Sequence, residues 1–383
     1  MTQEHSGDIS AAAIRQTIAE APRIVVKVGS SSLTTAEGIL DVTRLGAISD
    51  ALAARRLRGH QVVLVSSGAV AAGITPLGLT ARPRDLATQQ AAASVGQGAL
   101  IAAYTEAFGR HGLGVGQVLL TAADLNRSGH YVNARRALIR LMRLGIVPVV
   151  NENDAVATDE IRFGDNDRLA ALVAHLVGAG ALVLLTDTDA LYDGPPTEPT
   201  SVRLPLIRGA QDLRGIRIGG SGSLVGTGGM VTKVDAARIA TGAGVPTLLA
   251  AAGQIEDALA GADVGTVFAP WGARPTSKRL WLAHASEPEG TLVLDEGAVR
   301  AVVERGASLL PAGIVALEGA FAAGAPVELV GPDRRAVARG LVAFSSDELP
   351  RLLGRSTRWL GEVLGPHYAR DVVNRDYLVL VRR

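Results

Sequence analysis

From about residue 23 to residue 270, the sequence alternates between short β-branched apolar runs and longer stretches rich in Ala, Leu and Arg. The short runs are almost continuously apolar, as expected for strands that are covered on both faces. The longer stretches have helical spacing. This alternation predicts an α/β domain with a mainly parallel sheet that is sandwiched by helices. The predicted strands are 23–28, 61–65, 114–120, 146–150, 181–185 and 245–249, and the predicted helices are 41–57, 86–108, 133–144, 167–176 and 229–241.

The pattern changes near residues 268–290, a segment rich in Pro and Gly. Short strand-like runs separated by turn residues follow it, with one predicted helix at 295–304, and they indicate a small, mostly β domain. The strand-like runs are 290–294, 313–317, 326–330, 338–342 and 377–381. We expect four divisions: an N-terminal extension (1–22), an α/β domain (23–275), a second domain (288–366) and a C-terminal tail (367–383) that packs on the second domain.

Composition excludes several classes of protein. The absence of cysteine excludes a disulfide scaffold, a thiolate metal site and a cysteine nucleophile. The seven histidines are scattered without metal-ligand spacing, so we expect neither a metal site built from side chains nor a histidine base. The polar N-terminus does not resemble a signal peptide, and no apolar run approaches the ~18 residues of a membrane span. We therefore expect a cytoplasmic protein.

Lysine is rare in this chain. Lys27, Lys233 and Lys278 are the only lysines among 38 basic residues, and the others are arginine. Arginine has replaced lysine wherever either side chain serves, so a remaining lysine is a candidate for a position that needs a compact ammonium.

Ligands of open α/β sheets bind beyond the carboxyl ends of the strands. Four predicted strands end in small, polar or acidic residues, at 27–32, 66–69, 151–154 and 186–189. Lys27 lies within the first of these strands, among valines that are expected to be buried. We interpret it as a cation that faces an anion held by main-chain amides of the following residues.

A glycine-rich segment, residues 219–233, opens a predicted helix. Glycines allow close approach of the backbone, and a helix N-terminus supplies free N–H groups and a positive dipole end, so the segment is typical of phosphate binding. Its order of residues is not that of a P-loop, and no Gly-x-Gly-x-x-Gly follows any strand, which disfavours a dinucleotide dehydrogenase. The alternative is a surface loop whose Lys233 begins a solvated helix face.

The polar segment 154–168 follows the fourth predicted strand. Three polar residues stand together at 165–167, where helix capping accounts for only one of them. A substrate ammonium would need a carboxylate such as Asp154, and a substrate carboxylate would need neutral donors such as Ser67 and Asn166. Together with the two lysines, these residues favour phosphoryl transfer, which needs positioning and charge neutralisation more than a base.

Five segments of the α/β domain resemble, in order, those of the glutamate 5-kinase family, a branch of the amino acid kinase superfamily. They are VVKVGS (25–30), SGAVAAG (67–73), PVVNENDAV (148–156), FGDNDRL (163–169) and GTGGMVTK (226–233). Residues 292–346 resemble a PUA domain. The resemblance implies an amino acid kinase fold followed by a PUA-like domain.

The same resemblance implies roles for particular residues. Lys27 and Lys233 would flank the transferred phosphoryl group as catalytic residues, and Asp167 would organise them. Ser67, Asp154 and Asn166 would bind the substrate. The residues that would contact ATP are Lys27, Thr186, Asp187, Thr227, Gly228, Gly229, Met230, Val231, Thr232 and Lys233.

The implied reaction is phosphorylation of the side-chain carboxylate of L-glutamate by ATP. It yields L-glutamyl 5-phosphate and opens proline synthesis, and members of the family are typically inhibited by proline. Mg²⁺ would bridge the phosphates, held by nucleotide and water more than by side chains. The family also implies a homo-oligomer.

Two other hypotheses remain open. One is another kinase of the superfamily, acting on acetylglutamate, aspartate or UMP. The other is a PUA-driven RNA-binding protein, but residues 288–383 contain as many acidic residues as arginines, so we do not expect nucleic-acid binding. Two residues depart from the family pattern, Ala190 in place of Gly and Asn374 in place of His.

Overall fold

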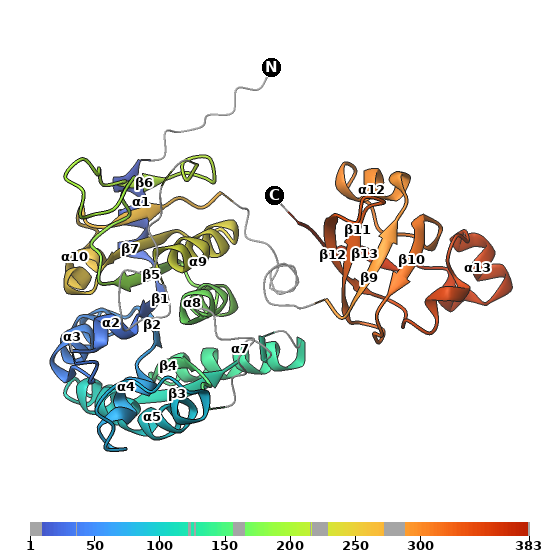
Figure 1. The fold of residues 1–383 in the computed structure, drawn as a ribbon. Coiled ribbons are helices and arrows are strands. Elements are labelled where there is room, and N and C mark those ends of the chain that lie inside the picture. Colours follow the sequence, from blue (N-terminus) through green and yellow to red (C-terminus); the bar gives the residue numbers. More distant parts are fainter. Residues whose placement is uncertain are drawn as a thin grey trace. The chain divides into compact units, whose positions relative to one another are not determined.

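The computed structural model describes residues 10–35, 37–121, 124–125, 128–155, 165–214, 216, 229–271 and 288–381. The chain folds into two compact units. The first unit contains the elements up to β8 (Thr266–Phe268), and the second contains β9 (Gly290–Leu294) and the elements after it. The stretch 125–128 is grouped with the second unit. Figure 1 labels the elements of both units.

An eight-stranded sheet forms the centre of the first unit, in the order β3-β4-β2-β1-β5-β7-β8-β6. Neighbouring strands are parallel except for the antiparallel pair β7 and β8. The predicted mainly parallel sheet is therefore confirmed. The strands other than β8 are β1 (Arg23–Val28), β2 (Gln61–Ser66), β3 (Val115–Leu120), β4 (Val147–Glu152), β5 (Ala181–Thr186), β6 (Leu206–Ile207) and β7 (Thr247–Ala251).

Helices cover both faces of this sheet (Figure 1). The five predicted helices are observed as α3 (Val42–Leu57), α5 (Leu86–Gly109), α7 (Ser128–Arg143), α8 (Asp165–Leu176) and α9 (Met230–Gly242). In the described part of the first unit, four shorter α-helices were missed in the sequence: α1 (Ala11–Glu20), α2 (Ser30–Leu33), α4 (Ala69–Ile74) and α10 (Ile255–Ala260). The short strands β6 and β8 were missed as well.

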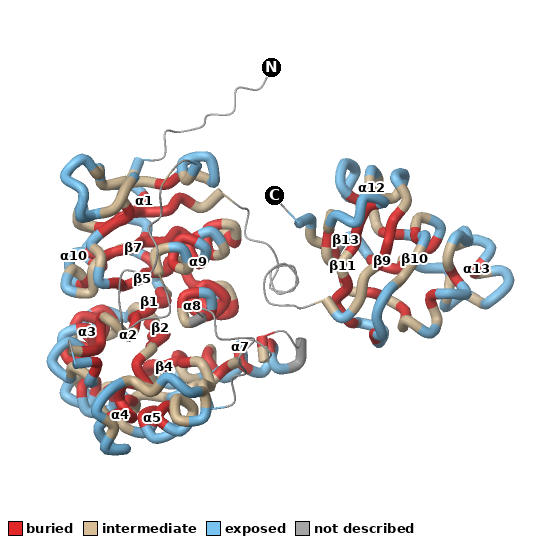
Figure 2. The backbone as a smooth tube through the Cα atoms, in the orientation of Figure 1, coloured by how far each residue is buried: buried red, intermediate tan, exposed pale blue. Residues whose placement is uncertain are grey.

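Strand β1 shows how the sheet divides its side chains between the two faces. Ile24, Val26 and Val28 pack into one hydrophobic core with residues of α1, α3, α5 and α10. Because side chains alternate along a strand, Lys27 points to the opposite face, where α8 and α9 lie. The buried strands stand out in red at the centre of this unit in Figure 2.

Helix α1 belongs to the core of the first unit, although the sequence assigned no role to residues 1–22. Ile14 and Ile18 on this helix are buried. Arg55 of α3, which is also buried, donates hydrogen bonds to the carbonyl oxygens of Ile18, Ala19 and Ala21 at the end of α1. This guanidinium binds carbonyl groups of the last turn of α1, where a helix leaves most of its acceptors unsatisfied.

The second unit contains a five-stranded sheet in the order β10-β9-β11-β12-β13. Strands β9 and β11 are parallel, and the other pairs are antiparallel. Side chains from the sheet and its short helices form a separate hydrophobic core. The prediction of a small, mostly β domain is confirmed. Its remaining elements are β10 (Ile314–Glu318), β11 (Pro326–Val330), β12 (Ala336–Val342), β13 (Val373–Leu380), α12 (Glu296–Val303) and α13 (Thr357–Val363).

Among the described residues, no helix is both long enough and apolar enough to cross a membrane.

Helices α4 and α5 approach each other at two glycines. A Cβ atom on Gly73 of α4 would overlap the carbonyl group of Ala92, and a Cβ atom on Gly96 of α5 would overlap the carbonyl oxygen of Ala69. Both glycines are buried. Because α4 follows β2 directly in the chain, this close packing also fixes the course of the backbone at the carboxyl end of β2.

Replacing Gly96 by alanine should therefore push α4 and α5 apart, whereas Gly98→Ala on the same helix should not, because nothing lies within 4 Å of the added Cβ. We expect Gly96→Ala to lower the free energy of unfolding by about 2 kcal/mol or more, through overpacking. Gly98→Ala should leave it unchanged or raise it by up to about 1 kcal/mol, through helix propensity. Denaturant unfolding followed by circular dichroism measures both, and equal effects of the two variants would contradict the close crossing.

Candidate active site

The four strands with polar ends are neighbours in the sheet, in the order β4-β2-β1-β5. Because all of them run parallel, their carboxyl ends meet at one edge. Lys27 near the end of β1, Ser67 after β2, Asn151 near the end of β4 and Thr186 at the end of β5 lie along this edge. The position matches the edge at which open α/β sheets bind ligands.

Asp167 of α8 lies between two lysines. Its Oδ1 atom is 2.6 Å from the Nζ of Lys27, and its Oδ2 atom is 3.4 Å from the Nζ of Lys233 on α9. The hydroxyl of Thr232 donates a hydrogen bond of 2.8 Å to Oδ2. All three charged side chains are at least 93% buried. One carboxylate thus holds two ammonium groups that come from a central strand and from a second helix.

Burial and charge act in opposite directions on these groups. Burial alone would raise the pKa of Asp167, but attraction by Lys27 and Lys233 outweighs it and the pKa falls below its ordinary value. For Lys233, burial dominates over the attraction of Asp167, and its pKa is lowered. Lys233 shares Asp167 with Lys27, and repulsion by Lys27 adds to the cost of its burial. An additional anion beside Lys233 would restore the balance.

A second group of side chains is neutral. The amide nitrogen of Asn166 donates hydrogen bonds to the Ser67 hydroxyl, at 2.9 Å, and to the Asn151 side-chain oxygen, at 3.0 Å. Among the described residues, the amide nitrogen of Asn151 and the side-chain oxygen of Asn166 have no hydrogen-bond partner. Two side chains that are hydrogen-bonded to each other therefore carry one unused donor and one unused acceptor, which a polar ligand could satisfy.

Asn151 was not predicted as a site residue. The available signal was its place at the end of β4, in the run Asn-Glu-Asn-Asp that also contains Asp154.

Asp154 itself is partly exposed, and Arg82, between α4 and α5, lies within electrostatic reach of it. Burial lowers the pKa of Arg82, and the carboxylate of Asp154 opposes that shift. The loop that carries Arg82 was not singled out because it lies far from any strand end in sequence.

The predicted nucleotide side lies along β5 and the beginning of α9. The Thr186 hydroxyl donates a 2.9 Å hydrogen bond to Asp187. Gly229 precedes the first turn of α9, and no described side chain caps that helix end. Its amide groups remain available to an anion. Met230 and Val231 belong to this turn, whereas Thr227, Gly228 and Lys278 lie outside the described residues.

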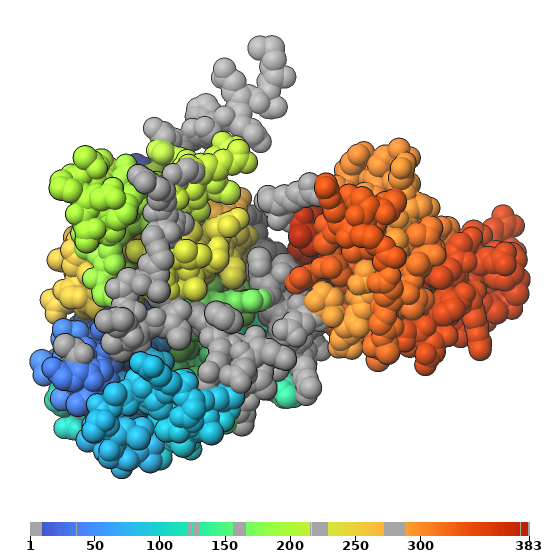
Figure 3. All heavy atoms as spheres, viewed as in Figure 1, coloured from blue at the N-terminus to red at the C-terminus, as the bar shows by residue number. Residues whose placement is uncertain are grey.

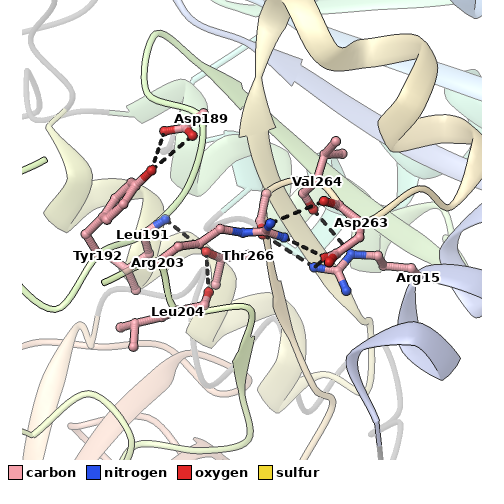
Figure 4. Close-up of polar contacts among 10 residues, drawn as sticks. Arg15, Asp189, Leu191, Tyr192, Arg203, Leu204, Asp263, Val264 and Thr266 are labelled. Atoms are coloured by element: carbon pink, nitrogen blue, oxygen red, sulfur yellow. Dashed lines mark hydrogen bonds and ion pairs between the residues drawn. The ribbon is translucent and has the colours of Figure 1, made fainter. Parts of the chain in front are cut away.

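The chain that leaves β5 is held against β8 (Figure 4). The amide of Leu191 donates to the Thr266 hydroxyl at 2.9 Å, and that hydroxyl donates to the carbonyl of Leu204 at 2.7 Å. Arg203 and Arg15 both bind Asp263, at 2.8 and 2.9 Å. The segment between β5 and β6, yellow-green in the space-filling view, lies at the surface of the first unit (Figure 3).

The two departures from the family pattern fit the structure without strain. Ala190 is buried and has no positive φ, so its backbone does not require glycine. Asn374 donates a hydrogen bond of 3.0 Å to Asp371 within the second unit.

This arrangement can neutralise a strongly anionic group at Lys27 and Lys233 and bind a polar ligand beside Asn151, Asn166 and Ser67. The part of the chain that the structure describes contains no group of three or more His, Cys, Asp or Glu side chains that could hold a metal ion.

Comparisons with known proteins give consistent results. Residues 22–250 match the amino acid kinase family, and residues 290–360 match the PUA domain. The chain is 62% identical to the glutamate 5-kinase of Streptomyces avermitilis, over 97% of this chain and 99% of that protein. It is 60% identical to that of Thermobifida fusca, over 96% and 95%, and 55% identical to that of Bifidobacterium longum, over 97% and 99%. Among solved structures, it is similar to a carbamate kinase from Giardia lamblia bound to AMP-PNP, with a TM-score of 0.49, 16% identity and coverage of 66% of this chain and 99% of that chain.

Removing the charge of Asp167 should destabilise the first unit. In Asp167→Asn, two buried ammonium groups lose their carboxylate, and we expect the free energy of unfolding at pH 7 to fall by about 3 kcal/mol. Because the pKa of Asp167 is lowered from its ordinary value of 3.8, its contribution is complete above that value and is lost as the pH falls through the lowered pKa.

The difference between wild type and variant should therefore be largest at neutral pH and shrink below about pH 4, in unfolding curves recorded across the pH range. Asp235→Asn, which breaks the exposed pair with Arg238 on α9, is the matched control, and we expect a change of at most about 0.5 kcal/mol. A stability loss in Asp167→Asn that does not depend on pH would rule out the charge as its cause.

Proposed function

Because this chain belongs to the amino acid kinase family and, within it, to the glutamate 5-kinases, we propose that it transfers the γ-phosphoryl group of ATP to the side-chain carboxylate of L-glutamate. The products are L-glutamyl 5-phosphate and ADP, and the reaction is the first step of proline synthesis. The comparisons confirm the family resemblance and the PUA domain that were predicted from the sequence. The observation that carries the residue-level proposal is the pair of buried lysines on Asp167.

The chemistry explains why two cations are needed and a base is not. A glutamate carboxylate has an ordinary pKa near 4.3 and is already ionised at neutral pH, so no side chain has to remove a proton before it attacks. Its attack brings one anion toward the γ-phosphate, another anion. Lys27 and Lys233 offset this repulsion and neutralise the charge that develops in the transition state. Asp167 positions both ammonium groups.

Substrate binding rests on the neutral group beside the lysines. Ser67 supplies a hydroxyl for a carboxylate, and Asn151 adds a buried amide nitrogen that has no partner among the described residues. Asn166, whose amide nitrogen already donates to Ser67 and Asn151, orients both and offers its side-chain oxygen to the ammonium group. Neutral donors suit a carboxylate that must later react, because a full cation there would stabilise it more strongly before the reaction than during it. Asp154 is assigned to the ammonium group of the amino acid, since it is the predicted acid at the same edge.

The nucleotide is assigned to the carboxyl end of β5 and the start of α9. Thr186, Asp187 and the residues from Thr227 to Lys233 are the proposed contacts, and the uncapped turn at Gly229 supports phosphate binding there. The described side chains do not form a cluster suited to Mg²⁺, and Asp167 is occupied by two lysines. Mg²⁺ would therefore be held by the phosphates of ATP and by water, and no step is assigned to it.

Two further expectations rest on the family alone: inhibition by proline and assembly into a homo-oligomer. The cytoplasmic location remains an expectation from the composition of the chain. For the second unit we propose a structural or regulatory role.

ADP release with a panel of acceptors tests the activity, with hydroxylamine to trap the acyl phosphate. We expect turnover and a hydroxamate product with L-glutamate. Turnover with acetylglutamate, aspartate or UMP, but not with glutamate, would contradict the substrate. An absence of turnover combined with tight RNA binding would contradict the enzyme.

The two lysines can be tested by replacing each with arginine, which keeps the charge and changes the shape. Lys27 and Lys233 are about 95% buried, so the broader guanidinium cannot occupy the same position. We expect kcat to fall about 10²- to 10³-fold in Lys27→Arg and in Lys233→Arg. Arg238→Lys, on the exposed side of α9, is the control and should keep normal turnover. Near-normal kcat in the two lysine variants would show that a compact ammonium is not required.

A further inference from the structure

Two buried hydroxyl groups lie directly behind Ser67. The phenolic oxygen of Tyr104, on α5, is 2.8 Å from the Oγ atom of Ser66, and this Oγ is 2.9 Å from the carbonyl oxygen of Ser67. Tyr104 and Ser66 are both completely buried. Neither residue was a candidate in the sequence, and neither touches the lysine group.

The direction of the protons follows from the number of donors. Ser66 has a single hydroxyl proton, and a carbonyl oxygen can only accept, so this proton points to the carbonyl of Ser67. Tyr104 must then donate its own proton to Ser66. Burial raises the pKa of Tyr104 well above its ordinary value, so the phenol keeps that proton at any working pH. The result is a one-way chain from Tyr104 through Ser66 to the backbone of Ser67.

The backbone at Ser67 is held from both sides. Its N–H group donates a 3.0 Å hydrogen bond to the carbonyl of Val28 on β1, the residue after Lys27. The next residue, Gly68, has φ 106° and ψ 1°, a left-handed conformation in which the chain turns sharply from β2 into α4. The peptide group between Ser67 and Gly68 could rotate at such a turn, and the Ser66 hydroxyl is the donor that fixes its carbonyl oxygen.

We propose that Tyr104 and Ser66 are positioning residues for the acceptor substrate: their two hydroxyls fix the carbonyl of Ser67 and thereby aim the Ser67 side chain at the amino acid. This inference rests on the proposed function, in which Ser67 binds glutamate. The Ser67 hydroxyl also accepts a hydrogen bond from Asn166, so a shift of Ser67 would disturb Asn166 as well. The nucleotide side, at β5 and α9, receives no contact from this chain of hydroxyls.

Three variants separate positioning from simple core stability. Tyr104→Phe removes only the phenolic oxygen, Ser66→Ala removes the donor to Ser67, and the double variant removes both hydroxyls. In Ser66→Ala, the buried phenol is left without its acceptor, which destabilises the protein. In the double variant no unpaired hydroxyl remains, so the stability should return close to that of Tyr104→Phe. The carbonyl of Ser67, however, still lacks its donor.

We expect the KM for glutamate to rise about threefold in Tyr104→Phe and about tenfold in Ser66→Ala, with the KM for ATP within twofold of wild type. The double variant should recover stability but keep the raised KM for glutamate. Ser49→Ala is the matched control. Ser49 is equally buried and donates to a main-chain carbonyl, that of Leu45, but lies on α3, away from the site. This control should leave both KM values unchanged.

The inference is overturned if the KM for glutamate follows stability and recovers in the double variant, or if neither single variant changes it. It is also overturned if the KM values for glutamate and ATP rise together, because a general disturbance of the fold would then be the cause. These outcomes are read only against an active wild type. Absence of glutamate turnover in the wild-type protein would instead contradict the proposed function, so the two failures are distinguishable.

Discussion

The contact between Asp167 and two buried lysines is the constraint on which the rest of the first unit depends. A charge buried without a partner is costly, so Lys27, Asp167 and Lys233 are tolerable only if β1, α8 and α9 bring them together. This requirement explains why β1 is central, with a strand on each side, and why α8 and α9 pack on the face to which Lys27 points. Repulsion between the two ammonium groups adds to the cost of burying Lys233, and a phosphate group would offset it.

The neighbouring group of side chains follows the opposite principle. Ser66, Ser67, Asn151 and Asn166 are neutral, and their hydrogen bonds form a connected network. Within the described part of the chain, one donor and one acceptor of this network have no partner. A neutral network can orient a carboxylate without holding it so strongly that it becomes a poor nucleophile. In the proposed reaction, the charged half would face the phosphoryl group and the neutral half would face the amino acid. The glycine crossing of α4 and α5 supports the neutral half, because it fixes the turn at Gly68.

The sequence predicted the five long helices and most strands of the first unit, but it missed several shorter elements. Strands such as β1 and β9 were predicted to the residue, because a run of buried β-branched residues bounded by turns leaves little choice. Helix α4 was missed because fewer than two helical turns show no 3.6-residue period, and strand β8 was missed because three residues form no recognisable run. In the site, Lys27, Asp167 and Lys233 were recognised from motifs, and the structure brings them together. Asn151 was missed because asparagine at a strand end is also an ordinary turn residue, and Tyr104 because a buried aromatic residue on a helix looks like core packing.

By itself, the sequence determined the class of the fold, the order of its elements and the residue types that the chemistry needs, because these depend on local periodicity and on motifs that are continuous in the chain. Only the tertiary structure decided which of these residues share a hydrogen bond or a charge, as Asn166 does with Ser67, 99 positions away in the sequence. It also decided that α1 is part of the core and that the phenol of Tyr104 contacts the Ser66 hydroxyl behind Ser67. These pairings depend on strand order and helix packing, which are set by contacts between distant segments and leave no local pattern in the sequence.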